Sequence, residues 1–428
     1  MRKFFALALV AVMMLALVAC GGGNDPANTG DSVATDNTTD NTSVSTDATT
    51  DATPVADDSF KIGFIFLHDE NSTYDLNFIN AAREAQAALG LSDDQVIFKT
   101  NIPESNECYE AALDLVDRGC TVIFADSFGH ESYMLQAARE NPDVQFCHAT
   151  GTMAHTEGLA NFHNAFASIY EGRYLAGIAA GLKLNEMIAA GNFKAEDAKI
   201  GYVGAFTYAE VISGYTSFFL GARSVCPTAT MEVQFTGSWY DETAEKEAAT
   251  TLISRGCKLI SQHADSMGAP TACETAGVPN VSYNGSTVAA CPNTFIVSSR
   301  INWAPYFEYI VNCAKSGEAI AADWTGTLAT GSVELSEINA KAAAEGTQAA
   351  IDAAVAKLEK GELHVFDTAV FTVGGETITS YLADVDTDAN YEKDTEVVAD
   401  GYFHESEKRS APYFDLDIDG ITKLNAAY

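Results

Sequence analysis

Two nine-residue stretches decide the fold: LVDRGCTVI at 115–123 and LISRGCKLI at 252–260. In both, a helical pattern ends at Arg-Gly and an apolar strand pattern follows. Glycine is favoured wherever a helix stops, so a common junction chemistry is one explanation of the match. The same order of elements precedes both copies, however, and the strand pattern KIG at 61–63 returns at 199–201. We interpret the two copies as an internal repeat, which predicts two similar α/β lobes.

The residues around the first copy alternate between strand and helix patterns. Apolar runs at 60–67, 95–98, 121–125 and 145–148 predict buried strands, and amphipathic stretches at 77–89, 105–118 and 131–140 predict helices. Strands that alternate with helices are typical of βαβ units. The predicted fold class is therefore α/β, with two doubly wound parallel-sheet lobes joined by a hinge. Such lobes present a ligand cleft between the carboxyl ends of their strands.

The chain before residue 59 has a different character. Arg2 and Lys3 precede an apolar run that ends at Cys20, the pattern of a secretory signal peptide over residues 1–20. Leu17 to Gly21 resembles a bacterial lipobox, which implies a lipidated Cys20; an ordinary secreted protein is the alternative. Residues 21–58 are small and polar, so we expect a disordered stalk.

Composition excludes several classes of function. The 428 residues include 59 acidic and 24 basic side chains, a formal net charge of −35. A surface this acidic repels phosphate backbones, so we expect no nucleic-acid partner and no anionic ligand. The cysteines and histidines show no metal-ligand spacing and no catalytic motif is present, so we expect no metal, no cofactor and no enzyme activity. Cysteine pairing stays open, because export permits disulfides.

Polar and aromatic side chains follow the predicted strands. Rings would stack on a flat, neutral or weakly basic aromatic solute, and carboxylates and amides would bond to its edge. The candidate ligand-binding residues are Asn71, Tyr74, Asp75, Ser127, Phe128, Glu171, Tyr208, Glu210, Trp239, Asp265, Asn284 and Trp303.

Several of these candidates also have a purely structural interpretation. Trp239 and Trp303 are equally compatible with core packing, Asp265 with capping of the next helix, and Glu171 with pairing to Arg173. At the level of sequence both interpretations stay open.

A family resemblance is carried by the segments DSFG at 126–129, PDVQFCHATG at 142–151, YEGRYLAG at 170–177, SWYD at 238–241, QHADS at 262–266 and WAPY at 303–306. From about Lys61 onward the chain resembles the basic membrane protein family of lipoproteins, the substrate-binding components of purine-type ABC importers. Members with Ser-Trp-aromatic-Asp and Trp-x-Pro-Tyr segments bind purine bases, whereas others bind purine nucleosides or riboflavin.

The resemblance implies a type I periplasmic binding protein-like fold and a role for each lobe. Trp239, with Tyr74 or Phe128, would stack on the purine, and Asp265 and Asn284 would meet its polar edge. The first loop, NSTYD at 71–75, departs from the Asp-x-Ser-Phe-Asn of nucleoside receptors and favours a free base. Three crossings would place 59–165 plus 298–325 in lobe one and 166–297 plus 326–428 in lobe two.

The function that follows is a receptor anchored by lipid at the extracytoplasmic face of the cell membrane. It would capture a purine nucleobase or nucleoside as a monomer and deliver it to an ABC permease and its ATPase. The alternatives are a receptor of the same fold for riboflavin, a sugar or an autoinducer, a surface or sensory lipoprotein, and an extracytoplasmic enzyme.

Overall fold

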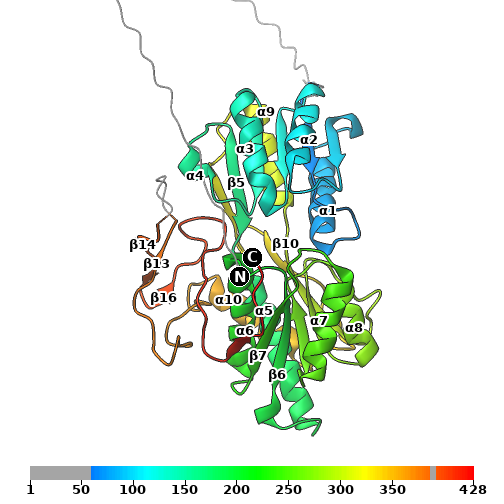
Figure 1. Ribbon diagram of the computed structural model, residues 1–428, viewed down its shortest axis with the longest axis vertical. Coiled ribbons are helices and arrows are strands. Elements are labelled where there is room, and N and C mark those ends of the chain that lie inside the picture. The colour runs from blue at the N-terminus through cyan, green and yellow to red at the C-terminus, as the bar shows by residue number, and fades with distance from the viewer. Residues whose placement is uncertain (1–58, 386–391) are drawn as a thin grey trace, which may run out of the picture. The chain divides into compact units, whose positions relative to one another are not determined.

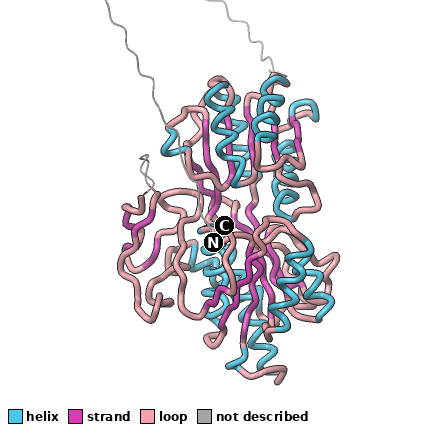
Figure 2. Tube along the Cα trace, in the orientation of Figure 1, coloured by secondary structure: helices cyan, strands magenta, loops and turns pink. Residues whose placement is uncertain are grey.

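Two mostly parallel β-sheets, one in each lobe, organise the molecule (Figure 1). The computed structural model describes residues 59–385 and 392–428. The predicted signal peptide, Cys20 and the stalk lie outside these ranges. Helices cover both sheets, and long loops make up much of the chain after residue 360 (Figure 2). The predicted α/β class is confirmed.

The lobe-one sheet has the strand order β11-β5-β4-β3-β1-β2, and all its pairs are parallel. Its strands are β1 (Ile62–Ile65), β2 (Val96–Lys99), β3 (Val122–Ala125), β4 (Gln145–Ala149), β5 (Phe162–Ala167) and β11 (Asp323–Gly326). Its helices are α1 (Thr73–Ala88), α2 (Asn106–Asp117), α3 (Glu131–Glu140), α4 (Ala154–Glu157) and α9 (Ala304–Ser316).

The lobe-two sheet has the order β12-β10-β9-β8-β6-β7-β17, and only the β10–β12 pair is antiparallel. Its strands are β6 (Lys199–Gly204), β7 (Thr230–Phe235), β8 (Leu259–Gln262), β9 (Asn280–Tyr283), β10 (Phe295–Ile301), β12 (Val333–Leu335) and β17 (Ile421–Lys423). Its helices are α5 (Ile169–Ala189), α6 (Ala209–Val225), α7 (Glu242–Ser254), α8 (Gly268–Ala276) and α10 (Thr347–Leu358). Two short hairpin pairs precede β17: β13 (Leu382–Ala383) with β14 (Thr395–Glu396), and β15 (Val398–Ala399) with β16 (Tyr402–Phe403).

The repeated nonapeptides build the same junction in both lobes. Gly119 and Gly256 follow α2 and α7 with φ of 84° and 93°, a left-handed conformation that glycine adopts without strain. The Lys61 ammonium donates to the Arg118 carbonyl at 3.1 Å, and the Lys199 ammonium donates to the Arg255 carbonyl at 3.0 Å. The predicted internal repeat is therefore present in the fold.

The first strand of each lobe contains a glycine for a matching reason. A Cβ on Gly63 would lie 2.7 Å from the Leu115 side chain, and one on Gly201 would lie 2.9 Å from Leu252. These leucines are the first residues of the two nonapeptides. Each glycine thus lets the helix of its own repeat pack directly on the central strand.

Strand residues alternate between two buried faces, as expected for a sheet covered on both sides. In lobe one, Phe64 and Phe124 join the core beneath α1 and α9, whereas Ile65 and Ile123 join the core beneath α2 and α3. This explains the near-continuous apolar runs of the sequence.

The first helix begins four residues earlier than predicted. The Ser72 hydroxyl accepts a hydrogen bond from the Asp75 amide, which caps α1 at Thr73. Tyr74 and Asp75 therefore belong to the first turn of a helix and not to the loop that the polar composition suggested.

The lobe boundaries at 165, 298 and 325 stay predictions. The strands nearest to them end at Ala167, Ile301 and Gly326. All eight cysteines of the described ranges are buried free thiols, which answers the open question of pairing for this structure. No helix in the same ranges combines the length and hydrophobicity needed to cross a membrane.

Candidate functional site

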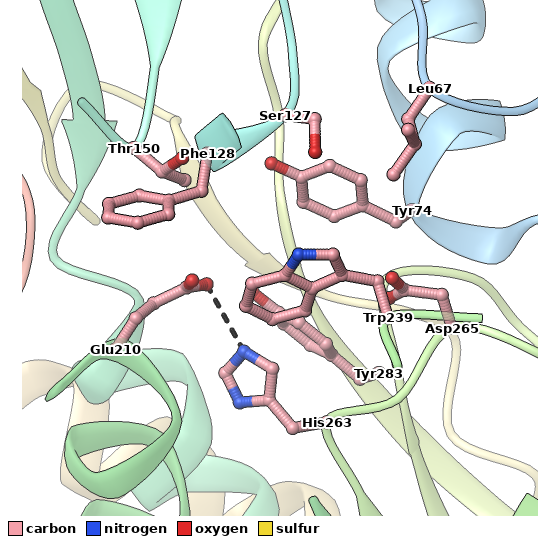
Figure 3. A pocket seen from close by; sticks show the side chains of 10 residues that line it. All are labelled: Leu67, Tyr74, Ser127, Phe128, Thr150, Glu210, Trp239, His263, Asp265 and Tyr283. Carbon is pink, nitrogen blue, oxygen red and sulfur yellow. Dashed lines mark hydrogen bonds and ion pairs between the residues drawn. The ribbon is translucent and has the colours of Figure 1, made fainter. Parts of the chain in front are cut away.

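A narrow cavity lies where the carboxyl ends of the two sheets face each other (Figure 3). Its lining consists of Leu67, Tyr74, Ser127, Phe128, Thr150, Glu210, Trp239, His263, Asp265 and Tyr283. About 340 Å³ of space free of protein atoms lies among them. We call this cavity the slot.

Aromatic rings from both lobes form the walls of the slot. Tyr74 and Phe128 come from lobe one, and Trp239, from the loop between β7 and α7, lies opposite them (Figure 3). Trp239 is braced edge-to-face by Phe206, with ring centroids 5.0 Å apart. The Phe128 and Tyr208 rings meet across the cleft at 5.6 Å. Such walls offer stacking surfaces to a planar ligand.

The Tyr74 hydroxyl is anchored to the backbone of Asp126, whose side chain belongs to a buried pair of carboxyl groups. This hydroxyl donates to the Asp126 backbone carbonyl at 2.7 Å. The Asp126 side chain accepts from the Leu67 amide, and Asp75 accepts from the His68 amide and the Ser72 hydroxyl. Burial, with the neighbouring Asp75 charge, raises the pKa of Asp126 well above its ordinary value. These groups hold the ring wall in place.

Two acidic side chains of lobe two face the slot. Asp265, which follows β8, is 5% exposed, and burial raises its pKa well above the ordinary value, with the charges of Glu245, Asp75 and Glu210 adding to the effect. Glu210, on the first turn of α6, lies 3.1 Å from the His263 Nε2 atom. The slot therefore combines aromatic faces with a hydrogen-bonding edge of carboxyl groups.

The two lobes touch directly beside the slot. The Thr73 amide and hydroxyl, at the start of α1, both donate to the Asp265 carbonyl at 3.0 Å. The His68 and Tyr240 rings lie 5.2 Å apart across the same cleft. The structure therefore has closely apposed lobes, and a ligand of molecular size reaches the slot only when they separate.

Six predicted site residues line the slot: Tyr74, Ser127, Phe128, Glu210, Trp239 and Asp265. Tyr208 lines the adjoining wider space, which shares Phe128, Thr150 and Glu210 with the slot.

Two predicted contacts lie beneath the surface and outside the lining. Asp75 is fully buried below Tyr74. Asn284 is 3% exposed, has a left-handed backbone with φ of 63°, and finds no partner for its amide nitrogen among the described residues. Neither touches the space in the slot.

Three predicted residues lie away from the slot. Trp303 is 1% exposed and stacks on Phe78 at 4.5 Å in the lobe-one core, which corrects its assignment to the lining. Glu171 accepts from the Ser168 hydroxyl at 2.6 Å and lines a separate pocket, so it pairs neither with Arg173 nor with the slot. Asn71 is exposed and donates to Asp69.

Four lining residues are missing from the list of candidates: Leu67, Thr150, His263 and Tyr283. His263 and Tyr283 stand in the same strand-end segments as the candidates Asp265 and Asn284, so their position in the sequence does indicate them. Leu67 and Thr150 also follow strands, but their residue types do not distinguish them, because an apolar residue and a hydroxyl residue are common at the end of any buried strand. Among the described residues, no group of three or more histidine, cysteine or acidic side chains is arranged to hold a metal ion.

Comparison with known proteins identifies the family. The sequence model of the Bmp family, described as "ABC transporter substrate-binding protein PnrA-like", matches residues 69–362. This chain belongs to the Bmp family. The Bmp chain is accordingly a substrate-binding protein of an ABC transporter and not an enzyme, and such proteins work outside the cytoplasm. The family resemblance carried by the sequence segments is confirmed.

Two curated relatives show how this Bmp protein compares in sequence. It is 30% identical over 255 residues to a purine-binding protein of Brucella abortus, an alignment covering 59% of this chain and 68% of that protein. It is 34% identical over 216 residues to a candidate ABC transporter glucose-binding protein of Haloferax volcanii, covering 50% of this chain and 51% of the relative.

Solved structures support the fold. A solute-binding protein of an ABC transporter system from Aeropyrum pernix superposes with a TM-score of 0.61 at 17% identity, covering 72% of this chain and 93% of that one. One from Conexibacter woesei gives a TM-score of 0.56 at 21% identity, covering 71% and 98%. The predicted type I periplasmic binding protein-like architecture is confirmed.

Proposed function

We propose that this Bmp protein captures an uncharged purine, as base or nucleoside, between its lobes and delivers it to an ABC permease driven by an ATPase. The observation that carries the proposal is the slot itself, a cavity walled by the rings of Tyr74 and Phe128 on one lobe and Trp239 on the other. A planar heterocycle can stack on such rings.

The edge of the slot supports a ligand rich in nitrogen. Glu210 can accept hydrogen bonds from ring N–H or amino groups, the buried Asp265 carboxyl adds a further polar group, and Ser127 and Thr150 add hydroxyls. A net charge of −35 and two acidic side chains at the slot disfavour a phosphate-bearing nucleotide. The Brucella abortus relative, named a purine-binding protein, agrees with this choice.

A thermal-shift panel of nucleobases, nucleosides, riboflavin and sugars tests the proposal. A ligand that binds only the folded state stabilises it by about 2.7 kcal/mol at 100 times its Kd, so a purine should raise the melting temperature measurably. A purine base giving the largest shift would favour the free base over the nucleoside. No shift with any purine refutes the proposal.

The second candidate ligand is a hexose. The 34% identical Haloferax volcanii relative, named a candidate glucose-binding protein, favours it, and tryptophan faces and carboxylates also suit a sugar. In the same panel, a shift with glucose and none with purines would select this alternative.

We further propose that the chain is a monomer anchored by a lipid on Cys20, at the end of a stalk. Residue 20 lies outside the described ranges, so this rests on the lipobox-like sequence. Fatty-acid labelling in a bacterial host, compared between the wild type and Cys20→Ser, tests it. Loss of label and release from the membrane fraction are expected for the variant, and unchanged membrane association would refute the anchor.

A further inference from the structure

Three side chains form a buried chain of hydrogen bonds that ends at the slot. The Arg173 guanidinium, on α5, lies 3.0 Å from His263 Nδ1, and His263 Nε2 lies 3.1 Å from Glu210 Oε1 (Figure 3 shows the second contact). Arg173 and His263 are 1% and 2% exposed. Arg173 lies behind the lining, whereas His263 and Glu210 belong to it.

The direction of each hydrogen bond follows from chemistry. Arginine has donors and no acceptor, so His263 Nδ1 must accept and carries no proton. The proton of the neutral imidazole then sits on Nε2 and is donated to Glu210 Oε1. Protonation of Nδ1 would place two cations against each other in a buried site, and burial together with the Arg173 charge lowers the pKa of His263.

The surrounding structure holds this arrangement from several sides. The Arg173 guanidinium also donates to the Gln262 carbonyl at 2.9 Å and lies 3.3 Å above the centroid of the Tyr283 ring. On α6, a Cβ at Gly214 would come within 2.9 Å of His263 Nδ1, so glycine makes room for the imidazole. The imidazole therefore has little freedom to turn or to exchange its partners.

We propose that Arg173 and His263 are positioning residues that present Glu210 to the slot as a fixed hydrogen-bond acceptor. Both ring nitrogens of His263 are engaged by protein partners, so Glu210 is the member of the three that can offer a polar atom to the slot, its second carboxylate oxygen. The site therefore selects heterocycles that place an N–H or amino donor at Glu210 and discriminates against analogues without that donor. This inference rests on the proposed purine function and specifies the chemistry of its ligand edge.

Substitution of Glu210 by glutamine gives a direct test. The carbonyl of the introduced amide would still accept from His263, which turns the amide NH₂ toward the slot, so Glu210→Gln replaces an acceptor by a donor. The probes are three ligand pairs, each differing in one donor: adenine and purine, guanine and hypoxanthine, adenine and 9-methyladenine. Calorimetric titration measures the Kd of each.

For at least one pair, we expect the wild type to bind the ligand with the donor about 10- to 100-fold more tightly, the range for a hydrogen bond to a charged group. Glu210→Gln should reduce that ratio to below about threefold. Glu407→Gln is the matched control, because Glu407 also pairs with a histidine, His404 at 2.7 Å, but lies outside the slot lining. It should keep the wild-type ratios.

Variants of His263 separate positioning from packing. His263→Gln keeps an acceptor for Arg173 and a donor for Glu210, so adenine affinity should stay within about threefold of the wild type. His263→Leu keeps apolar volume but neither polar group, so it should lower the affinity for adenine about tenfold. In ¹⁵N NMR at neutral pH, a resonance absent from His263→Gln should show the Nε2-protonated tautomer.

The outcomes distinguish this inference from the proposed function. If no purine binds the wild type, the proposed function fails. If purines bind but the ratio of Kd values within every ligand pair is the same for the wild type and Glu210→Gln, only the role of Glu210 is overturned. An Nδ1-protonated His263, or an affinity of His263→Leu equal to that of His263→Gln, overturns the positioning role.

Discussion

Replacement of Trp239 tests whether the ring wall of lobe two supplies binding energy. The side chain is half-buried, braced by Phe206 at 5.0 Å, with the ring wall of Tyr74 opposite it. Leucine at this position keeps apolar volume and removes the aromatic face. Stacking between an aromatic side chain and a base contributes about 1–3 kcal/mol, so Trp239→Leu should raise the Kd for a purine about 5- to 150-fold.

Trp239→Phe separates stacking from size. Phenylalanine keeps a ring face, so Trp239→Phe should lose less than about 1 kcal/mol of binding free energy, or about fivefold in Kd. Calorimetric titration provides the Kd, and circular dichroism and the melting temperature of each variant verify its fold. Trp324→Phe is the matched control, because Trp324 packs on Tyr306 at 5.0 Å outside the slot. A folded Trp239→Leu protein with wild-type affinity, or equal losses for leucine and phenylalanine, would refute the reasoning.

Two further predictions concern stability. Burial raises the pKa of Glu405 from 4.5 to about 7, so the unfolded chain ionises first as pH rises and the folded state loses about 3 kcal/mol between about pH 4.5 and pH 7. Glu405→Gln keeps a carbonyl acceptor for the Tyr413 and Phe414 amides but cannot ionise. Measured by urea unfolding, the free energy of unfolding of this variant minus that of the wild type should be about 3 kcal/mol larger at pH 8 than at pH 4.5. The same difference at both pH values would contradict this prediction. A Cβ on Gly177 would lie 2.0 Å from the Phe218 carbonyl oxygen, so Gly177→Ala forces α5 and α6 apart and should lower the free energy of unfolding by about 1–3 kcal/mol. An unchanged urea midpoint would show that the helices separate at no cost.

Much of the site could be anticipated, because strand ends are visible in the sequence. Ser127, Phe128 and Asp265 come within three residues of the ends of β3 and β8, and the carboxyl ends of parallel strands gather at one edge of a sheet. Which of these side chains points into the space between lobes depends on the closing of one lobe on the other. That is why Asn284, also at a strand end, lies below the lining.

The two tryptophans nearest the cleft illustrate the same limit. Trp239 and Trp303 are equally plausible ligand contacts in the sequence. In the structure Trp239 faces the slot, whereas Trp303 stacks on Phe78 inside lobe one. The local sequence indicates that a large ring is buried. Whether the ring packs in the core or lines the ligand cavity depends on the path of the whole chain.

The sequence by itself determined the two-lobed plan, because its causes are local. Apolar runs, helix ends at glycine and the KIG strands each act over a few residues, and they recur in the same order in both halves. Only the tertiary structure decided the partners of Arg173. The sequence offers Glu171 two residues away, yet neighbours at that spacing on a helix point in different directions. The guanidinium instead meets His263 and Tyr283, which the β-sheet of lobe two brings to the buried side of α5.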